Sequence, residues 1–214
     1  MVLLQQQIQF PPVSWADEDG LLAVGGDLSP ERLLAAYPLG IFPWYGENSP
    51  ILWWSPNPRC VLFPEQLQVS KSMQQIIKQE KFEWRTNTAF EQVIQHCAAT
   101  PRKDQEGTWI TAEITTAYTR LHQLGHAHSA EAWLNGILVG GLYGILIGKV
   151  FFGESMFSHQ SNASKFAFIK WVRHLQAKGI QLIDCQMETP HLKSLGAITL
   201  PREKFIKKLQ ELCA

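Results

Sequence analysis

The sequence predicts an α+β fold, with a small N-terminal α+β domain followed by a larger domain built on a mixed β-sheet. Three observations lead to this prediction. Residues 1–62 are rich in proline, glycine and tryptophan, which indicates short strands and turns. The stretch 127–156 reads as apolar strands separated by tight turns. From residue 163 onward helical and strand patterns alternate, which is typical of helices packed on a sheet. We therefore predict two domains, 1–62 and 63–214.

One helix stands out in the N-terminal region. Ser29 is a suitable N-cap and Pro30 suits the first helical position, so we expect a helix over residues 30–37 that stops before Pro38. The following stretch, P-I-L-W-W-S-P-N-P-R-C-V-L-F, predicts short strands broken by proline turns.

Apolar spacing predicts three helices and one short strand between residues 70 and 125. Gly125 is expected to end the third helix. The expected elements are helices at 70–80, 90–98 and 114–123, a strand at 82–86 and a charged loop at 100–107.

A three-stranded antiparallel meander is predicted next. Asn135 and Gly136 lie between two β-rich runs and favour a type I′ hairpin turn, and Gly148 and Lys149 mark a second tight turn. The expected strands are 127–134, 137–147 and 150–156.

The remaining chain predicts alternating helices and strands. Residues 161–164 offer caps for a long helix that Gly179 ends. The expected elements are a helix at 163–177, a strand at 180–186, a helical piece at 191–195, a strand at 198–200 and a helix at 202–212. From residue 70 onward this order is similar to the mixed sheet of GNAT-type acyltransferases, which is an analogy about fold and does not settle function.

The charge balance bears on nucleic-acid binding. The chain has 19 basic and 19 acidic side chains, so its overall field cannot hold a nucleic acid and any such contact must be a local patch. Basic residues gather in one segment and again at Arg102 and Lys103, and these are either solvated faces or a phosphate-contacting patch beside a cleft. The first group is Lys71, Lys78, Lys81 and Arg85.

Composition argues against a membrane protein and against a metal site. The longest apolar stretch, 137–147, is about half a membrane span, and three glycines interrupt it. The N-terminus lacks the basic and apolar regions of a signal peptide, so we expect a soluble, cytoplasmic protein. None of the four cysteines forms a C-x-x-C pair, and we interpret them as reduced thiols. The histidines at 122–128 have no obvious carboxylate partner, so we expect no metal.

Polar side chains on two core-like strands are the candidate chemical groups. In I-Q-L-I-D-C-Q, Asp184 and Gln186 are two residues apart and should share one face of the strand. We expect Asp184 to orient the Gln186 amide, whose oxygen can then accept a hydrogen bond from an attacking N–H. Glu154 repeats the pattern in F-F-G-E-S-M-F, where strict alternation groups it with Phe152 and Met156.

The acyl donor is expected to differ from coenzyme A. A GNAT-type protein holds the pyrophosphate of this cofactor in a glycine-rich turn before a helix. The corresponding turn here, S-H-Q-S-N-A-S-K, has no pair of glycines.

Motifs spread over nearly the whole chain closely resemble one family, the bacterial leucyl/phenylalanyl-tRNA–protein transferases. The match runs from about residue 20 to 205. The motifs are G-L-L-A-V-G-G-D-L-S, G-I-F-P-W, W-W-S-P-N-P-R, G-T-W-I, A-H-S-A-E-A-W, L-V-G-G-L-Y-G, G-E-S-M-F, N-A-S-K, D-C-Q and H-L-K-S-L-G-A.

The resemblance implies a reaction and its partners. Leucine or phenylalanine moves from Leu-tRNA or Phe-tRNA to the α-amino group of a protein that begins with Arg or Lys. The product enters N-end-rule degradation. The family has a small N-terminal domain and a GNAT-like C-terminal domain, and it uses neither coenzyme A nor a metal.

The resemblance also implies site residues. Asp184 and Gln186 fall on the catalytic acid and amide, and Trp109 falls beside the adenosine-binding cleft. The remaining substrate-binding positions are Glu154, Ser155 and Met156 on the pocket strand, Phe151, Ile183, Leu142 and Phe168 around the donor side chain, and the aromatic residues Trp53, Tyr37 and Tyr118.

Two alternatives stay open at this point. One is a CoA-dependent N-acetyltransferase, against which the missing glycine turn argues. The other is an RNA-binding module that stacks bases on some of its eight tryptophans, against which the strand carboxylates and zero net charge argue. Asp184→Ala should abolish turnover but leave tRNA binding nearly intact in an enzyme. We take a monomer as the default.

Overall fold

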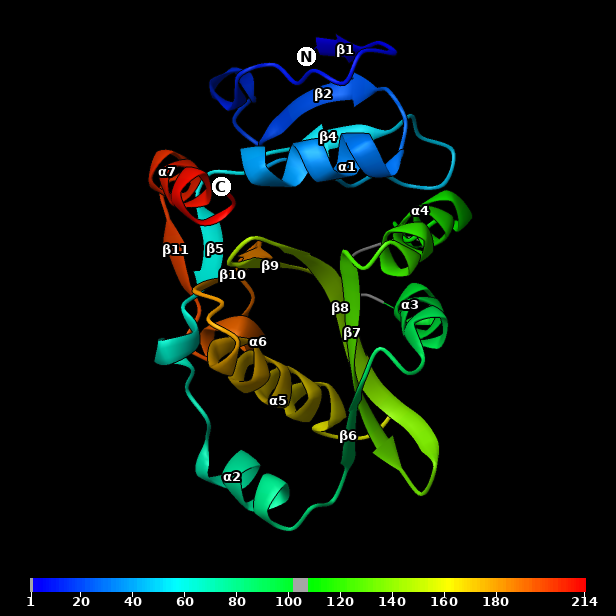
Figure 1. The fold of residues 1–214 in the computed structure, drawn as a ribbon, viewed down its shortest axis with the longest axis vertical. Coiled ribbons are helices and arrows are strands. Elements are labelled where there is room, and N and C mark those ends of the chain that lie inside the picture. The colour runs from blue at the N-terminus through cyan, green and yellow to red at the C-terminus, as the bar shows by residue number, and fades with distance from the viewer. Residues whose placement is uncertain (1, 102–107) are drawn as a thin grey trace.

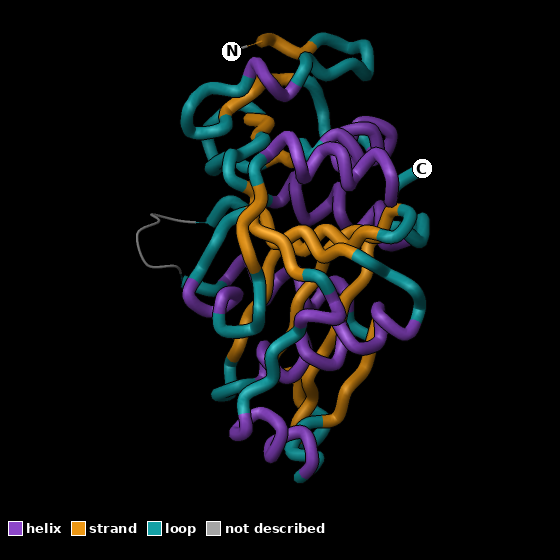
Figure 2. The backbone as a smooth tube through the Cα atoms, turned by 90° about the vertical axis from the view of Figure 1, so that its left-hand side faces the viewer, coloured by secondary structure: helices purple, strands orange, loops and turns teal. Residues whose placement is uncertain are grey.

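The computed structural model describes residues 2–101 and 108–214 and contains two sheets (Figures 1 and 2). The small sheet has the order β1-β2-β4-β3, with α1 beside it. Its elements are β1 (Val2–Leu4), β2 (Leu21–Gly25), α1 (Pro30–Ala36), β3 (Phe42–Pro43) and β4 (Leu52–Trp54). Both termini lie toward this end of the molecule (Figure 1).

The large sheet is mixed and has the strand order β11-β5-β10-β9-β8-β7-β6. Only the β9–β10 pair is parallel, and the other neighbours in this sheet are antiparallel. The strands are β5 (Arg59–Leu62), β6 (Glu83–Thr86), β7 (Ala127–Leu134), β8 (Ile137–Ile147), β9 (Val150–Ser158), β10 (Leu182–Gln186) and β11 (Ile198–Leu200). The predicted α+β class with a small sheet and a larger mixed sheet is confirmed.

Helices cover both faces of the large sheet. In Figure 1, α3 and α4 lie on one side of β7 and β8, and α5 lies on the other. The helices are α2 (Lys71–Lys78), α3 (Phe90–Ala99), α4 (Ala112–Gln123), α5 (Ala163–Ala177), α6 (Pro190–Lys193) and α7 (Arg202–Leu212). No helix in the described ranges is long and apolar enough to cross a membrane.

The helix ends show how local chemistry sets the element bounds. As predicted, Ser29 caps α1 by accepting a hydrogen bond from the Arg32 N–H, and Pro30 opens the helix. The cap of α5 differs from the prediction, because the side chain of Asn162 makes no capping bond. Instead, Ser158 at the end of β9 accepts a hydrogen bond from the Ser164 N–H at 3.2 Å.

The predicted hairpins are also present. Asn135 and Gly136 have φ angles of 51° and 77°, as a type I′ turn requires. Gly148 has a φ of 56°, and a Cβ there would lie 2.3 Å from the Leu212 carbonyl oxygen, so only glycine fits between the turn and α7.

The two sheets share a hydrophobic core. One buried cluster joins Leu22 and Trp53 of the small sheet to Tyr143 and Phe152 of the large one and to Phe90 of α3. A second cluster lies between the large sheet and α5. The predicted boundary at residue 62 stays a proposal. Since β5 pairs within the large sheet, a boundary drawn by sheet membership falls before residue 59.

Candidate active site

A pocket of about 410 Å³ opens where β9 and β10 separate. The parallel pairing of these strands ends at Phe152 and Asp184, and the residues after these two line the pocket. A separation of two parallel strands leaves backbone and side chains facing a shared opening, which is a common place for a binding site. The lining residues are Phe42, Pro43, Trp44, Thr100, Trp109, Leu142, Tyr143, Phe151, Gly153, Glu154, Ser155, Met156, Phe168, Ile183, Asp184, Cys185, Gln186, Met187, Thr189, His191 and Leu192.

Glu154 is the extra residue of a β-bulge on β9. Gly153 pairs with Gly144 of β8 and Ser155 pairs with Tyr143, which leaves Glu154 without a partner on β8. The expectation of strict alternation along this strand is therefore wrong beyond Gly153. The bulge shifts the pattern by one residue.

The bulge brings side chains to the pocket that alternation had placed on opposite faces. Phe151 and Met156 are five residues apart, yet both line the pocket. Gly144 permits this close approach, because a Cβ there would lie 2.2 Å from the Phe152 carbonyl oxygen.

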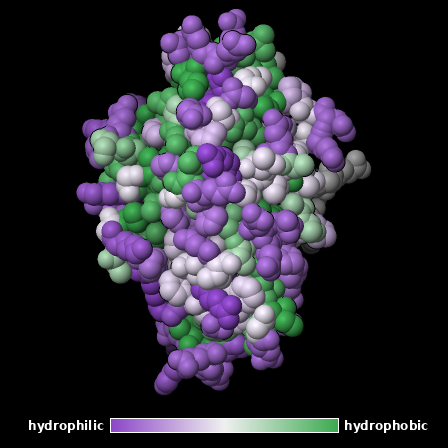
Figure 3. All heavy atoms as spheres, turned by 45° about the vertical axis from the view of Figure 1, so that its right-hand side comes forward, coloured by the Kyte–Doolittle hydropathy of each residue, from purple (hydrophilic) through white to green (hydrophobic). Residues whose placement is uncertain are grey.

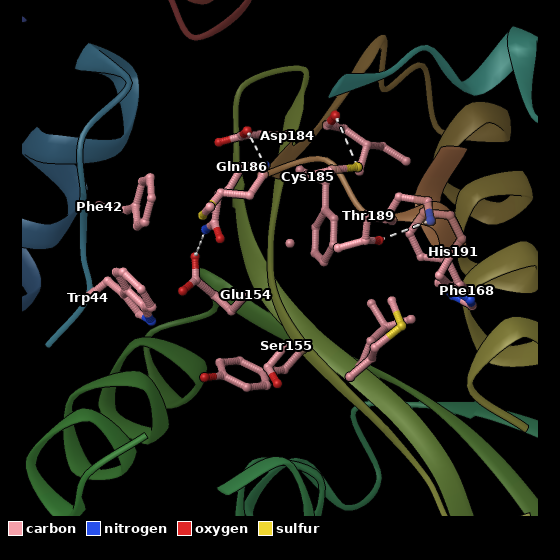
Figure 4. Close-up of a pocket in the computed structure, with 18 of the residues that line it drawn as sticks. Phe42, Trp44, Glu154, Ser155, Phe168, Asp184, Cys185, Gln186, Thr189 and His191 are labelled. Carbon is pink, nitrogen blue, oxygen red and sulfur yellow. Dashed lines mark hydrogen bonds between the residues drawn. The ribbon is translucent and has the colours of Figure 1, made fainter. Parts of the chain in front are cut away.

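A second bulge lies on β10, at Cys185. Asp184 pairs with Val61 of β5 and Gln186 pairs with Cys60, so Cys185 is the extra residue. Gln186 has a φ of 60°, which is uncommon for a residue with a side chain. The predicted sharing of one face by Asp184 and Gln186 is thus broken, and the two side chains diverge (Figure 4).

Asp184 is fully buried and is held by Arg59. The Arg59 Nε lies 2.8 Å from Asp184 Oδ1, and the Nη2 lies 2.6 Å from Oδ2. The guanidinium lies between the rings of Phe42 and Phe205, with its Cζ 4.7 and 4.8 Å from their centroids. Such a bidentate pair, stacked on aromatic faces, fixes the carboxylate rigidly.

The expected contact between the Asp184 carboxylate and the side-chain amide of Gln186 is not present. Asp184 Oδ1 accepts a hydrogen bond from the backbone N–H of Gln186 at 2.9 Å. The side-chain amide of Gln186 instead donates to Glu154 Oε1 at 3.1 Å. Asp184 therefore fixes the main chain of Gln186, and Glu154 fixes its side chain (Figure 4).

Two buried tyrosines complete a polar cluster around Glu154. The Tyr37 hydroxyl donates to Glu154 Oε1 at 2.8 Å, and the Tyr118 hydroxyl lies 3.2 Å from Oε2. The two hydroxyls also hydrogen-bond to each other. Burial raises the pKa of both tyrosines, so both keep their protons at neutral pH.

Counting protons in this cluster shows which form of Glu154 fits. Three contacts join Tyr37, Tyr118 and Glu154, but two hydroxyls supply only two protons. A protonated Glu154 supplies the third. In agreement, burial raises the pKa of Glu154 to about 7, although the tyrosine hydrogen bonds lower it in part.

The predicted donor-side residues come together in the pocket. Apolar side chains form one lobe, and Trp109 and Ser155 also line the opening. The lobe consists of Leu142, Phe151, Met156, Phe168 and Ile183. Tyr37 and Tyr118 do not line the pocket themselves. Their hydroxyl groups contact Glu154, which does.

Trp53 is not brought to the pocket. It is fully buried in the small sheet, and its indole N–H donates to the Gly25 carbonyl at 2.9 Å. Trp44, which was not selected from the sequence, lines the pocket instead (Figure 4).

The predicted basic patch does not lie beside the pocket. None of its four residues lines the pocket, and α2 and β6 lie at the end of the molecule away from the small sheet (Figure 1). Hydrophilic side chains predominate at the tip of that end in Figure 3, with smaller hydrophobic patches beside them. Arg85 is paired with Glu83 at 2.8 Å and lies over the Trp133 ring. Arg102 and Lys103 lie outside the described residues.

Arg59 is the main residue that the sequence analysis missed. It precedes the apolar run C-V-L-F, and a cation at the start of a buried strand needs a partner. The sequence therefore indicated that Arg59 needs a buried partner, but it did not show that the partner is Asp184. In the described parts of the chain, no three His, Cys, Asp or Glu side chains gather as a metal site.

Comparisons with known proteins converge on one family. Residues 61–210 match the family described as leucyl/phenylalanyl-tRNA protein transferase, and residues 26–57 match the N-terminal domain of the same family. A leucyl/phenylalanyl-tRNA–protein transferase of Christiangramia forsetii is 57% identical over 98% of this chain and 100% of its own. That of Nitrosospira multiformis is 56% identical over 95% of this chain and 88% of its own.

Solved structures with a similar arrangement have low identity. A GCN5-related N-acetyltransferase from Kribbella flavida has a TM-score of 0.40 and 9% identity, and the match covers 81% of this chain and 61% of that one. The structure of L-PGS from Bacillus licheniformis has a TM-score of 0.43 and 10% identity, over 79% and 54%.

Proposed function

The chain belongs to the leucyl/phenylalanyl-tRNA protein transferase family and is an aminoacyltransferase, and on this premise we propose how its pocket works. Aminoacyl-tRNA is the donor and a protein is the acceptor. We propose that leucine or phenylalanine is transferred to the α-amino group of proteins that begin with Arg or Lys, which marks them for N-end-rule degradation. The observation that carries this proposal is a single pocket that joins an apolar lobe to the Glu154–Gln186 pair.

The apolar lobe receives the side chain of the donor amino acid. Its walls are aliphatic, aromatic and thioether groups, with no charged side chain among the five. A lobe of this kind discriminates against smaller side chains by roughly 1–3 kcal/mol per methylene, which gives a preference for large apolar donors.

Trp109 and Trp44 provide flat surfaces for the adenosine that ends the tRNA. Both line the same opening as the apolar lobe. Stacking of a base on an indole is worth roughly 1–3 kcal/mol and tolerates any base. The two tryptophans thus support binding of the 3′ end, while the lobe reads the amino acid.

Gln186 orients the attacking amine. Its amide nitrogen donates to Glu154, so its amide oxygen is left to accept a hydrogen bond from the N–H of the acceptor. The amine nitrogen then bonds to the ester carbonyl carbon, and the bond from that carbon to the ribose oxygen breaks. One amine proton ends on the ribose oxygen. Because the ester is already activated, positioning supplies most of the catalysis.

Glu154 is the group suited to proton exchange during this step. A carboxyl group with a pKa of about 7 exchanges its proton readily at neutral pH. When ionised, it also attracts a cationic acceptor. The other pocket carboxylate, Asp184, is already paired with Arg59. We assign Asp184 a positioning role, in which it fixes the bulge that presents Gln186.

The basic residues of α2 and β6 are proposed to contact the tRNA body away from the pocket. Lys71, Lys78 and Lys81 carry positive charge on or beside α2, at one end of the molecule. Phosphate contacts of this kind position a nucleic acid without reading its sequence. We propose further that the enzyme acts in the cytoplasm as a monomer.

The reaction is tested by mixing the protein with Leu-tRNA, Phe-tRNA or acetyl-CoA and a protein beginning with Arg, and by measuring the intact mass of the acceptor. We expect a gain of one leucine or phenylalanine, and none with acetyl-CoA. An acceptor that begins with Glu serves as the matched control and should gain nothing. Acetylation without aminoacyl transfer would contradict the proposal.

A further inference from the structure

Two cysteines face each other across β5 and β10, beside the polar cluster. Because Cys185 is the extra residue of the β10 bulge, both Cys185 and Gln186 lie opposite Cys60. Cys60 belongs to the apolar cluster between the large sheet and α5, and Cys185 packs against the same cluster, so the two thiols lie on the same face of the sheet. The Cys185 thiol donates to the Ile183 carbonyl oxygen at 3.9 Å. Residues opposite each other on antiparallel strands have Cα atoms about 4.5–5.5 Å apart, which is within the range that a disulfide can bridge.

The two thiols differ in exposure and in acidity. Cys185 is half-buried and lines the pocket, whereas Cys60 is 1% exposed. The interaction between the two side chains lowers the pKa of the Cys60 thiol and raises that of Cys185. An oxidant entering the pocket therefore meets Cys185, and Cys60 lies behind it as the more readily ionised partner.

We propose that Cys60 and Cys185 form a reversible disulfide that switches this site off under oxidation. A peroxide supplies the oxidising equivalents. The Cys185 sulfur attacks one peroxide oxygen, the O–O bond breaks, and the departing oxygen takes the thiol proton, which leaves a sulfenic acid. The Cys60 sulfur then attacks the Cys185 sulfur, the S–S bond forms, the S–O bond breaks and water leaves.

The position of Cys185 explains why the disulfide should change activity. Cys185 lies between Asp184, which is anchored to Arg59, and Gln186, whose amide reaches Glu154. A disulfide bond of about 2.05 Å is shorter than any hydrogen bond between thiols, so oxidation draws the bulge toward β5. A displacement of about 1 Å at a positioning group can reduce a rate by roughly 100-fold.

The switch rests on the proposed function only for its readout of activity, and the disulfide itself can be measured separately. The reduced protein is treated with hydrogen peroxide, digested and analysed by mass spectrometry, and transfer from Leu-tRNA is measured before treatment, after it and after dithiothreitol. We expect a cross-link between the peptides holding Cys60 and Cys185, a loss of activity of tenfold to 100-fold, and recovery with dithiothreitol.

Cys60→Ala is the decisive variant, with Cys213→Ala as the matched control. Cys60→Ala should keep its basal rate, and peroxide should cause little of the reversible loss of activity in it. Cys213→Ala should lose activity with peroxide and regain it with dithiothreitol, as the native protein does. Absence of the cross-link would overturn the proposal, as would a cross-link without loss of activity. An equal reversible loss in Cys60→Ala would also overturn it. A protein that forms the cross-link on oxidation but is inactive both before treatment with oxidant and after full reduction would instead count against the proposed function.

Discussion

The buried pair of Arg59 and Asp184 gives the sharpest prediction, because it separates a positioning role from a role as a base. Asp184→Asn keeps an oxygen that can accept the Gln186 N–H but removes the charge that compensates Arg59. Both side chains are at most 1% exposed, so solvent does not screen the charge that remains. Breaking a buried pair in this way destabilises a protein by roughly 3–5 kcal/mol.

That free energy predicts a large change in melting temperature. For chains of 150–250 residues, 1 kcal/mol corresponds to roughly 2–4 °C, so Asp184→Asn should melt roughly 6–20 °C below the native protein. The double variant Arg59→Met/Asp184→Asn removes both charges and keeps the acceptor for Gln186. It should recover at least about 2 kcal/mol relative to the sum of the single changes.

Transfer rates then distinguish the two roles. Urea unfolding at 25 °C gives the stabilities, and single-turnover transfer is measured where every variant is folded. If Asp184 positions Gln186, the double variant should recover a rate within about tenfold of the native protein, since asparagine holds the same N–H. A double variant that is stable yet as inactive as the single variant would refute the positioning role, because asparagine cannot accept a proton.

Three further predictions concern the pocket and the basic end. Burial raises the pKa of Glu154 from its ordinary value of 4.5 to about 7, so between these pH values the native state binds a proton that the unfolded state has lost. The free energy of unfolding should therefore fall by roughly 3 kcal/mol as pH rises from 4.5 to 7, and urea titrations should find this slope absent in Glu154→Gln. Phe168→Leu shortens one wall of the donor lobe and should raise the kcat/KM ratio of Phe-tRNA to Leu-tRNA by about tenfold, a change that competition between the two donors would measure. Lys78→Ala should weaken tRNA binding and reduce the slope of log K against log salt by roughly 0.7–0.9, whereas Lys204→Ala on α7 should leave the slope unchanged.

Much of the fold was predictable because local chemistry decides it. Ser29 and Pro30 begin α1 because their side chains suit the cap and the first helical position. The turn at residues 135–136 forms a hairpin because Asn and Gly tolerate the positive φ angles that it needs. The motifs that resemble a family named many of the residues that line the pocket, but Trp53 lies outside it and Trp44 was not among them. The sequence did not predict which side chains share a face of β9 and β10, because a β-bulge has no sequence pattern that distinguishes it within an apolar strand. Glu154 and Cys185 look like ordinary strand residues until the partner strands are known.

The partner of a buried charge was equally inaccessible from one sequence. Arg59 and Asp184 are 125 positions apart, and neither has a local pattern that names the other. The same is true of the Glu154 cluster, whose tyrosines come from the short 3-10 helix η2 (Tyr37–Leu39) after α1 and from α4. The Arg59–Asp184 pair depends on β5 and β10 becoming neighbours in the large sheet, and the Tyr37–Glu154 contact depends on the packing of the N-terminal region against that sheet, so only the assembled fold reveals them.

The two bulges explain how a polar site exists in the middle of an apolar sheet. On β9 the bulge disturbs the ladder to β8, and on β10 it disturbs the ladder to β5, while the parallel pair between them ends at the same level. Bulges bend strands and increase their twist, so irregularities on both outer ladders turn the central strands apart. Polar groups then face an opening instead of a neighbouring strand. The Arg59–Asp184 pair anchors one side of this opening and the two tyrosines anchor the other, which leaves Gln186 between two fixed supports. A change that loosens either support should therefore reduce transfer before it reduces donor binding, since the apolar lobe depends on neither.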